Sequence, residues 1–507
     1  MEGRVYRVAG LVALVTLAAA PAAAQRRVPD FASPFLPPDH WAIGAAGRLH
    51  ALGLVAHGFD RARRPLTRRE VGRIFEAAAR RAERDRPALL PLVRAYGARY
   101  AEEFPATMAA LAGADSAGAR LGDGSITAGY EVHSGKLLPG LGYENGQDWT
   151  GPVRLEDVST ATGAVDGSAE LFPILAVGVA PVRAAGDWSF DGGYATGVWR
   201  DAGFWIGRRT FGFVPGVGGG IVVNPTVAFD GVGFFLADAV LLPGFLDALG
   251  PFLFETFLSR GEQDGPIERP WIWGMRATIE PHARFGLGLT RMAMFGGEGK
   301  NGLNLKNLAF LMVGKHAGAG SGFDNQIFSL DAWFRPPFRA LPAVAYIEWG
   351  LEDSAGAWFD VPGIVLGFEI PALPGAPGVA VGVERASFGR RCCGNPIWYR
   401  HWQFLGGWTN DGVALGHPLG GHGSEWRTWT RADVLEARLR LESAVFFRDR
   451  GDENLFAPDR EGSSTGAVVS AAFRAAPFID IVLRAGAESG ARDWTEAGAV
   501  LGLRMLF

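Results

Sequence analysis

The chain has 507 residues, 72 of them glycine, and a formal net charge of -4. Proteins that bind nucleic acid normally carry a basic stripe, so this balance of charges gives no support to a nucleic-acid partner. The chain also contains 34 Phe and 16 Trp, and this mixture of aromatic residues with glycine suits many strands and tight turns better than a helical bundle.

The first residues, MEGRVYRVAGLVALVTLAAAPAAAQ, have the pattern of a secretory signal peptide. Arg4 and Arg7 form a charged start, Val8 to Ala20 is a short apolar run, and the alanines before Gln25 form a small-residue cleavage site. The apolar run is shorter than the ~20 residues that a membrane-spanning helix needs. We therefore expect residues 1–24 to be a signal peptide and the mature chain to be exported.

Residues 25–118 show the 3.6-residue period of helices. Asp39 is a plausible N-cap for a first helix, and Thr67 and Glu70 have the spacing of a capping box before a second. We expect a small periplasmic α-helical region that acts as a cap or plug. The stretch 39–71 also resembles a single surface-layer-homology repeat, which implies binding of cell-wall polymers as an alternative role.

From about Gly122 onward the period changes to 2, which is the period of β-strands. In AGAVLGLRMLF (497–507) one face is apolar and the other carries glycine and Arg504, and LEARLRLES (435–443) alternates apolar with charged residues. Apolar runs at 220–228 and 400–408 are also read as strands. The total is about eighteen candidate strands.

Two architectures fit this alternation, a soluble sandwich and a transmembrane barrel. The barrel is favoured because the alternation continues from residue 119 to Phe507, because the strands have the ~9–11 residues that cross a bilayer, and because an aromatic last residue resembles the final strand of bacterial outer-membrane proteins. We expect residues 119–507 to form an all-β transmembrane β-barrel of about 16–18 antiparallel strands, in the bacterial outer membrane. The small N-terminal α-helical region precedes it.

Signatures of catalysis and of cofactor binding are weak. The chain has no H-E-x-x-H motif, and PGVGGGIVVN (215–224) lacks the spacing of a nucleotide-binding loop. The adjacent Cys392 and Cys393 do not form a C-x-x-C pattern. We expect neither an enzyme nor a bound cofactor. Carboxylates on predicted lumen faces are expected to form ion ladders with arginines; they are Glu255, Glu280, Glu348, Glu352 and Glu436.

Residues 398–426, WYRHWQFLGGWTNDGVALGHPLGGHGSEW, are rich in aromatic residues, histidine and glycine. The histidines are 16 and 5 positions apart, which is not a usual zinc spacing, so we expect no metal. A long glycine-rich segment between barrel strands is typical of an extracellular loop. Its polar and aromatic side chains are candidates for polysaccharide binding: Trp398, Tyr399, His401, Trp402, Trp408, Asn410, His417, His422 and Trp426. The alternative is that several of them form an interfacial girdle or pack the loop into the lumen.

Several stretches resemble the Wzi-type capsule assembly proteins. The resemblance rests on FWIGRRTFGFVPGVGGGIVVNPTVAFDGVGFFL (204–236), LPGFLDALGPFLFETFLS (242–259) and residues 398–426. The matching motifs are the glycine-rich turn from Gly216 to Asn224, the pair Gly250-Pro251, and the aromatic run from Tyr399 to Gly420.

This resemblance implies a lectin-like outer-membrane barrel that binds capsular or extracellular polysaccharide and helps in surface attachment or capsule assembly, without catalysis. The implied partners are the surface polysaccharide, outer-membrane lipid and the outer-membrane assembly machinery. The alternative function is a porin-like channel for small solutes or oligosaccharides, whose charged lumen would set selectivity.

Overall fold

The computed structural model describes most of the chain after residue 30. The described residues are 31–55, 58–113, 120–121, 124–136, 156–172, 175–184, 187–225, 228–261, 267–298, 306, 311, 324–338, 341–352, 361–389, 391–392, 395–396, 398–401, 403–410, 413–454, 460–491 and 493–507. The predicted signal peptide and Cys393 lie outside these residues.

The N-terminal part is helical, as expected. Its elements are α2 (Trp41–Ala51), α3 (Arg68–Asp85), η1 (Pro87–Leu89), α4 (Leu90–Glu103) and α5 (Pro105–Leu111). The N-cap of α2 is His40, whose side chain accepts a hydrogen bond from the backbone of Ala42, so the prediction of Asp39 was wrong by one residue. Thr67 caps α3 by accepting from Glu70 N at 3.2 Å, as the capping-box spacing predicts.

The remaining chain forms a closed antiparallel barrel. Eighteen strands among the described residues make its wall: β3 (Ser125–Lys136), β4 (Glu156–Phe172), β5 (Leu175–Ala184), β6 (Asp187–Trp199), β7 (Ala202–Thr210), β9 (Ala228–Leu236), β11 (Pro251–Arg260), β12 (Trp271–His282), β13 (Phe285–Phe295), β14 (Asp324–Phe334), β15 (Val344–Glu352), β16 (Gly363–Ile370), β17 (Val379–Phe388), β22 (Gly423–Val434), β23 (Leu439–Arg450), β24 (Gly462–Ala476), β25 (Ile479–Gly490) and β26 (Trp494–Leu506). Pairing of β9 with β11 and of β26 with β3 completes the ring.

Shorter strands accompany the wall. They are β1 (Arg63–Arg64), β2 (Arg120–Leu121), β8 (Gly212–Phe213), β10 (Val240–Leu241), β18 (Arg391–Cys392), β19 (Asn395–Pro396), β20 (Thr409–Asn410) and β21 (Val413–Ala414). A 3-10 helix, η2 (Gly244–Leu249), lies between β10 and β11. No described helix has the length and apolar character needed to cross a membrane.

Side chains alternate between the outer face and the lumen along the wall strands. In β26, Leu501 and Leu503 are exposed on the outer face, whereas Val500 is buried toward the interior, which confirms the predicted pattern of 497–507. The outer face is therefore an apolar band, and the lumen contains the polar and charged side chains. The core of a soluble sandwich would require the opposite arrangement.

Three strand predictions were wrong. Residues 220–228 lie largely in a loop inside the barrel, and 400–408 belong to another loop, because an apolar run is equally suited to burial in the lumen. The alternating stretch 435–443 begins with a turn at 435–438 and enters β23 only at Leu439, so Glu436 is exposed rather than in the lumen. The number of strands is right because β4 and β22 replace the two false strands.

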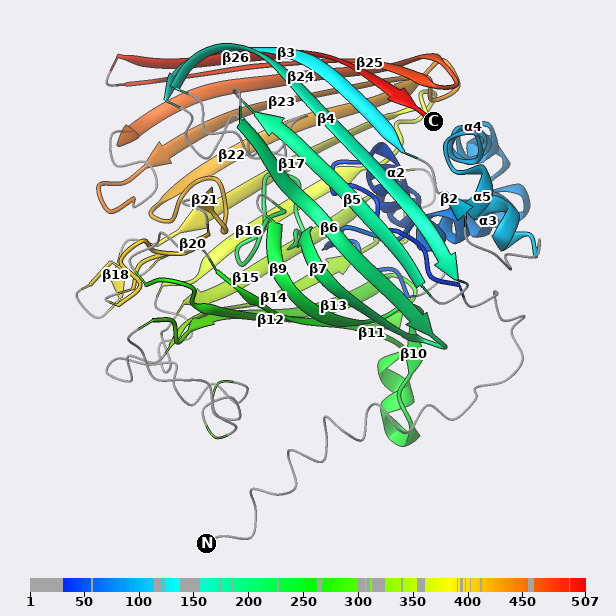
Figure 1. Cartoon of the computed structure of the whole chain (residues 1–507), viewed down its shortest axis with the longest axis horizontal. Helices are drawn as coiled ribbons and strands as arrows, with labels where there is room; N and C mark the ends of the chain where they lie inside the picture. The colour runs from blue at the N-terminus through cyan, green and yellow to red at the C-terminus, as the bar shows by residue number, and fades with distance from the viewer. Residues whose placement is uncertain are drawn as a thin grey trace, which may run out of the picture.

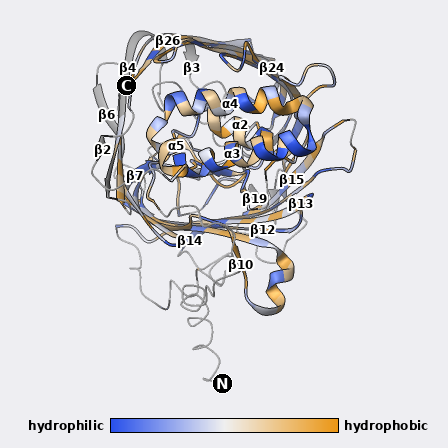
Figure 2. Ribbon diagram, turned by 90° about the vertical axis from the view of Figure 1, so that its right-hand side faces the viewer, coloured by the Kyte–Doolittle hydropathy of each residue, from blue (hydrophilic) through white to orange (hydrophobic). Residues whose placement is uncertain are grey.

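The two ends of the barrel differ (Figure 1). The helical region and the C-terminus lie at one end, which we call the helix end, together with short turns such as 435–438 and 477–478. Longer connections, including 389–422, lie at the opposite end, which we call the loop end. Figure 2, seen from the helix end, shows the helices within the ring of strands.

The N-terminal segment is fixed inside the helix end by buried polar contacts. Arg48 of α2 bonds to the carbonyls of Pro371 and Pro377, each at 2.7 Å, and to Asp433 of β22 at 2.9 Å. Arg276 of β12 joins Asp60 at 2.6 Å to Asp331 of β14 at 2.7 Å. The strand β1 pairs with β8 inside the barrel.

Glu103, at the end of α4, is the centre of a second set of contacts. Its buried carboxylate accepts hydrogen bonds from His40 at 2.8 Å and Trp41 at 2.7 Å. It also meets Arg474 of β24 at 3.1 Å and Arg504 of β26 at 3.9 Å. The helical region is thereby connected to the wall close to the seam between β26 and β3.

Candidate functional site

The first layer of the candidate site is a loop held in the lumen by carboxylates of the wall. Residues 211–225, which we call the glycine loop, follow β7. Glu384 of β17 accepts hydrogen bonds from the backbone of Val217 at 2.7 Å and Gly218 at 2.8 Å. Glu348 of β15 accepts from Ile221 N at 3.0 Å and from Ser329 at 2.7 Å. These bonds satisfy backbone groups that burial would otherwise leave unpaired.

The second layer is the segment 398–422, which we call the plug loop, and it packs on the glycine loop. Tyr399 donates its hydroxyl to the carbonyl of Ile221 at 2.9 Å and accepts from His417 N at 2.8 Å. The indole of Trp408 donates to the carbonyl of Val222 at 2.7 Å. Asn224 donates to the carbonyl of Gly416 at 2.7 Å.

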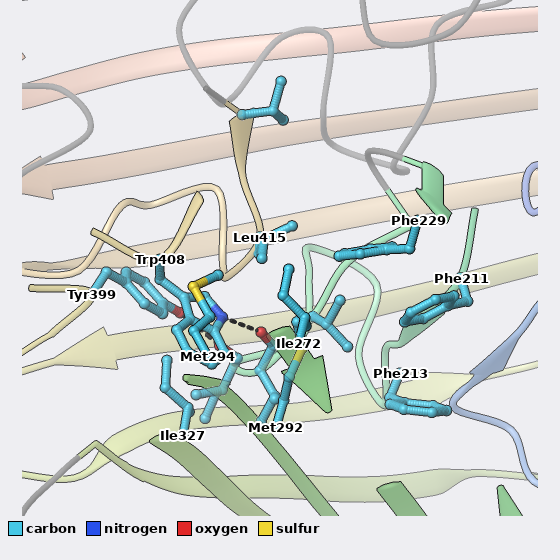
Figure 3. Close-up of a cluster of buried hydrophobic side chains, with 14 of the residues drawn as sticks. Phe211, Phe213, Phe229, Ile272, Met292, Met294, Ile327, Tyr399, Trp408 and Leu415 are labelled. Atoms are coloured by element: carbon cyan, nitrogen blue, oxygen red, sulfur yellow. Dashed lines mark hydrogen bonds between the residues drawn. The ribbon is translucent and has the colours of Figure 1, made fainter. Parts of the chain in front are cut away.

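These contacts lie in one apolar cluster near the middle of the barrel. Figure 3 shows Tyr399 and Trp408 of the plug loop beside Met294 of β13 and Ile327 of β14, with Leu415 above them. The wall, the glycine loop and the plug loop therefore form a continuous core across the lumen. Removal of any one layer would expose apolar surface of the others.

The predicted site residues are placed in three kinds of environment. Trp398, Tyr399, Trp408, Asn410 and His417 are buried. His401 and His422 are partly buried, and the outward-facing Trp426 is exposed on β22, with Arg385 5.0 Å from its ring centre. Trp402 lies outside the described residues. Polysaccharide binding by this set remains a prediction, and in this conformation the buried members have no surface to offer a sugar.

The three histidines do not converge on one point. The Nδ1 of His417 accepts from Leu419 N at 3.1 Å, and burial lowers the pKa of His417 to about 4. The Nδ1 of His401 accepts from Gln403 N at 3.2 Å, whereas His422 accepts from Glu453 N at 3.2 Å. Among the residues that the structure describes, no group of three or more His, Cys, Asp or Glu is arranged to hold a metal ion.

The lumen wall near the loop end carries a dense network of ion pairs. Glu425 pairs with Arg427 at 2.9 Å and Arg448 at 2.5 Å, and Glu488 pairs with Arg448 at 2.8 Å and Arg450 at 2.7 Å. Ion pairs of the predicted kind are therefore present on the wall, but Glu425 and Glu488 are not among the carboxylates predicted to form them. Of the predicted carboxylates, Glu255, Glu280, Glu348 and Glu352 are buried, as a position in the lumen requires. Glu255 pairs with Arg209 at 2.8 Å, whereas Glu348 bonds to Ser329 and to the backbone of Ile221 and not to any arginine that the structure describes.

One sequence motif with the letters of a nucleophile elbow proves to be part of the wall. Residues 462–466, GSSTG, lie within β24 and not on a strand-to-helix turn. The hydroxyl of Ser464 donates to Glu488 at 2.6 Å and accepts from Arg450 at 3.2 Å. Ser464 is therefore a member of the ion-pair network formed by Glu488 and Arg450.

Sequence reasoning missed the roles of Asn224 and Glu384. A usable signal was the cluster of glycines, because a Cβ at Gly216 would lie 2.4 Å from Glu384 Oε2 and one at Gly218 2.6 Å from Oε1. Glycine is required where another group approaches the backbone this closely. The pairing partner, 166 residues away, could not be read from the sequence.

Comparison with known proteins identifies one matching family and similar solved structures. The family model described as capsule assembly protein Wzi matches residues 116–495. The solved structure of Wzi from Escherichia coli, described as an outer-membrane protein involved in group 1 capsule assembly and as a carbohydrate-binding β-barrel, is similar with a TM-score of 0.72. It is 17% identical, over 93% of this chain and 99% of that one.

More distant similarity extends to two Pseudomonas aeruginosa structures. OpdQ has a TM-score of 0.46 and 9% identity, covering 77% of this chain and 98% of its own. The outer-membrane protein OpdK has a TM-score of 0.44 and 8% identity, covering 76% of this chain and 98% of its own. A search of curated proteins found no significant match.

Proposed function

The chain belongs to the Wzi capsule assembly family, and from this we propose that it is an outer-membrane β-barrel that binds capsular or extracellular polysaccharide. The bound polymer would be held at the cell surface, for attachment or for assembly of a capsule. Surface polysaccharide, outer-membrane lipid and the outer-membrane assembly machinery are its proposed partners. Catalysis forms no part of the proposal.

The observation that carries this proposal is the obstructed lumen. The N-terminal segment occupies the helix end, and the glycine loop and plug loop cross the interior through direct hydrogen bonds to the wall and to each other. A cavity of about 400 Å³ remains between the N-terminal segment and the wall, lined by residues that include Arg64, Tyr194 and Arg484. An obstructed barrel is suited to binding a polymer at its surface rather than to conducting solutes.

The loop end is the end that we assign to the outside of the cell. Bacterial barrels have short periplasmic turns and longer extracellular loops, and here the short turns lie with the helices. The helical region is then periplasmic and faces away from the polysaccharide. Export of the mature chain after residue 24 belongs to the same proposal.

Within the plug loop, the predicted residues divide by exposure. We assign sugar contact to the partly exposed side chains His401 and His422, and to the neighbouring Leu405, which is 70% exposed. Tyr399 and Trp408 would support binding by keeping the loop in place. Trp426 lies on the outer face of the wall, where an aromatic side chain suits the membrane interface.

The first experiment is direct titration of the purified barrel with the surface polysaccharide of its source organism and with an unrelated polysaccharide. Saturable binding to the native polymer alone is expected. The same preparation should give no discrete conductance steps in planar bilayers, because the lumen is obstructed. Conductance steps without polymer binding would instead favour a channel.

The variant His401→Ala tests the location of the binding surface. Loss of one hydrogen bond worth about 0.5–1.5 kcal/mol should weaken polymer binding roughly 2- to 10-fold. The matched control is His282→Ala at the helix end, since the Nδ1 of His282 also accepts a backbone hydrogen bond two residues on, from Arg284 at 3.1 Å. Equal loss of affinity in both variants would remove the plug loop from the binding surface.

A further inference from the structure

The connection between β9 and β11 carries the most exposed large apolar side chain of the described residues. Phe245, in η2, is 86% exposed, and neighbouring Leu241 of β10 is also exposed. None of the side chains of η2 is buried. In a soluble environment this would be an unfavourable arrangement, because burial of a Phe side chain is strongly stabilising.

The helix η2 projects away from the barrel instead of packing on it. Figure 1 shows it extending from the helix end beyond β10 and β11, and Figure 2 shows it outside the ring of strands. Gly250 makes the return possible, because its φ is +73° and a Cβ there would lie 2.0 Å from the carbonyl oxygen of Glu280. The projection is thus fixed by a tight turn against β12.

The sequence of the projection is apolar on two of its three faces. In a 3-10 helix, residues three apart lie on the same face, so Phe245 shares a face with Ala248, and Leu246 shares one with Leu249. Asp247 and Gly244 form the third face. Between 239 and 250 the only charged residue is Asp247, and there is no Lys or Arg. With one charged side chain, the projection has little to offer a basic or acidic partner surface.

The projection continues an apolar ring around the helix end of the barrel. Other exposed apolar side chains at this end are Trp199 at the end of β6, Phe338 and Phe478 between strands, and the C-terminal Phe507. In a membrane-embedded barrel such a ring lies at the level of the lipid headgroups. A short apolar helix directed away from the wall at this level lies along the plane of the membrane.

We propose that β10, η2 and the turn to β11 form an interfacial anchor that inserts Phe245 into the acyl-chain boundary of the periplasmic leaflet. Its ligand is the hydrocarbon of phospholipids, and Asp247 remains on the aqueous side. This inference rests on the proposed membrane location of the barrel. It adds a lipid contact outside the wall strands, on one side of the barrel only.

Spin labelling tests the anchor directly. With Cys392 and Cys393 replaced by serine, a single cysteine is introduced as Phe245→Cys, labelled, and studied in nanodiscs that hold one copy of the full chain. Leu501→Cys, on the outer face of β26, is the control for lipid, and Arg84→Cys, on the exposed side of α3, is the control for water. Accessibility to oxygen and to a water-soluble nickel chelate is measured at each position.

The label at 245 is expected to resemble that at 501, with high accessibility to oxygen and protection from the chelate. Chelate access at 245 with protection at 501 would overturn the anchor and leave the membrane barrel intact. Chelate access at both positions would contradict the membrane location itself. Because each nanodisc holds one copy, protection at 245 cannot come from a second copy of the chain.

Discussion

At the scale of single residues, buried polar groups decide how the plug is held. Tyr399 has a positive φ of 61° and a hydroxyl that both donates to the glycine loop and accepts from the plug loop. From the sequence, its aromatic ring was a candidate for stacking on a sugar. In the structure the ring is buried, and the residue holds the two loops together. The sequence shows that a tyrosine is present among glycines, but only the three-dimensional contacts show which way its ring points.

His417 and His50 make the folded protein sensitive to acid. Burial lowers the pKa of each to about 4, below the ~6.5 of an unfolded histidine. Between pH 6.5 and 4 the unfolded chain binds protons that the folded chain does not, so stability falls as the pH falls through this window. Each histidine would account for about 3 kcal/mol of this decrease in the free energy of unfolding.

The variant His417→Asn should remove the contribution of about 3 kcal/mol that His417 makes to this dependence on pH, because an Asn oxygen cannot be protonated in this range but can still accept from the backbone of residue 419. The measurement is urea unfolding of the purified barrel at pH 7 and pH 4, with the native chain in parallel. An unchanged difference between the two pH values would show that His417 is protonated without penalty in the folded state.

At the scale of elements, the period-2 pattern predicts the wall but not the loops inside it. The strand at 497–507 was predicted correctly, since one of its faces meets lipid and the other meets the interior. The run at 220–228 contributes Ile221, Val222 and Val223 to the lumen core, and the run at 400–408 contributes Phe404 and Trp408. Their apolar composition does not distinguish that core from a membrane. The helices were predictable from their period and, for α3, from the cap at Thr67. Their docking in the barrel depends on Arg48 and Glu103, whose partners lie hundreds of residues away.

Substitution of Gly216 tests whether the glycine loop holds the plug loop. Gly216→Val would bring side-chain atoms into contact with Glu384 and should displace the loop, at a cost of about 1–3 kcal/mol for overpacking. Hydrogen exchange should rise in both 211–225 and 398–422. Gly47→Ala in α2 is the control, because a Cβ there meets nothing within 4 Å and exchange should stay unchanged or fall. Faster exchange confined to 211–225 would show that the two loops are independent.

At the scale of the whole molecule, the barrel and its helical region are joined by many buried ion pairs and hydrogen bonds, among which those of Arg48 form one group. Arg48 makes contacts with two connected parts of the wall, the turn 371–378 and β22, and also with Tyr96 of α4 at 3.0 Å. The eighteen wall strands pair only with one another along most of their length. The helical region should therefore loosen without loss of the wall.

Arg48→Met tests this separation. Removal of one member of a buried, hydrogen-bonded charge pair costs about 3–5 kcal/mol. Hydrogen exchange of α2, α3 and α4 should increase several-fold, while the strands β22 to β26 keep their protection and the variant migrates like the native chain on unheated gels. Arg84→Met, on the exposed face of α3, serves as the control. Loss of protection throughout the wall would show that the helical region is required for the barrel itself.

The contacts of Glu103 link the filled interior of the barrel to the closure of its wall. The chain enters the lumen before its first wall strand begins, yet the wall is completed only where the last strand, β26, pairs with β3. Glu103 supplies negative charge to Arg474 and Arg504 beside that junction. A wall that closed over an empty interior would keep Asp480, which bonds to Arg474 at 2.5 Å, but would lose the second carboxylate that Glu103 supplies. Loading of the interior and closure of the wall are thus thermodynamically coupled, so that the finished barrel is most stable when it has closed around its own N-terminus.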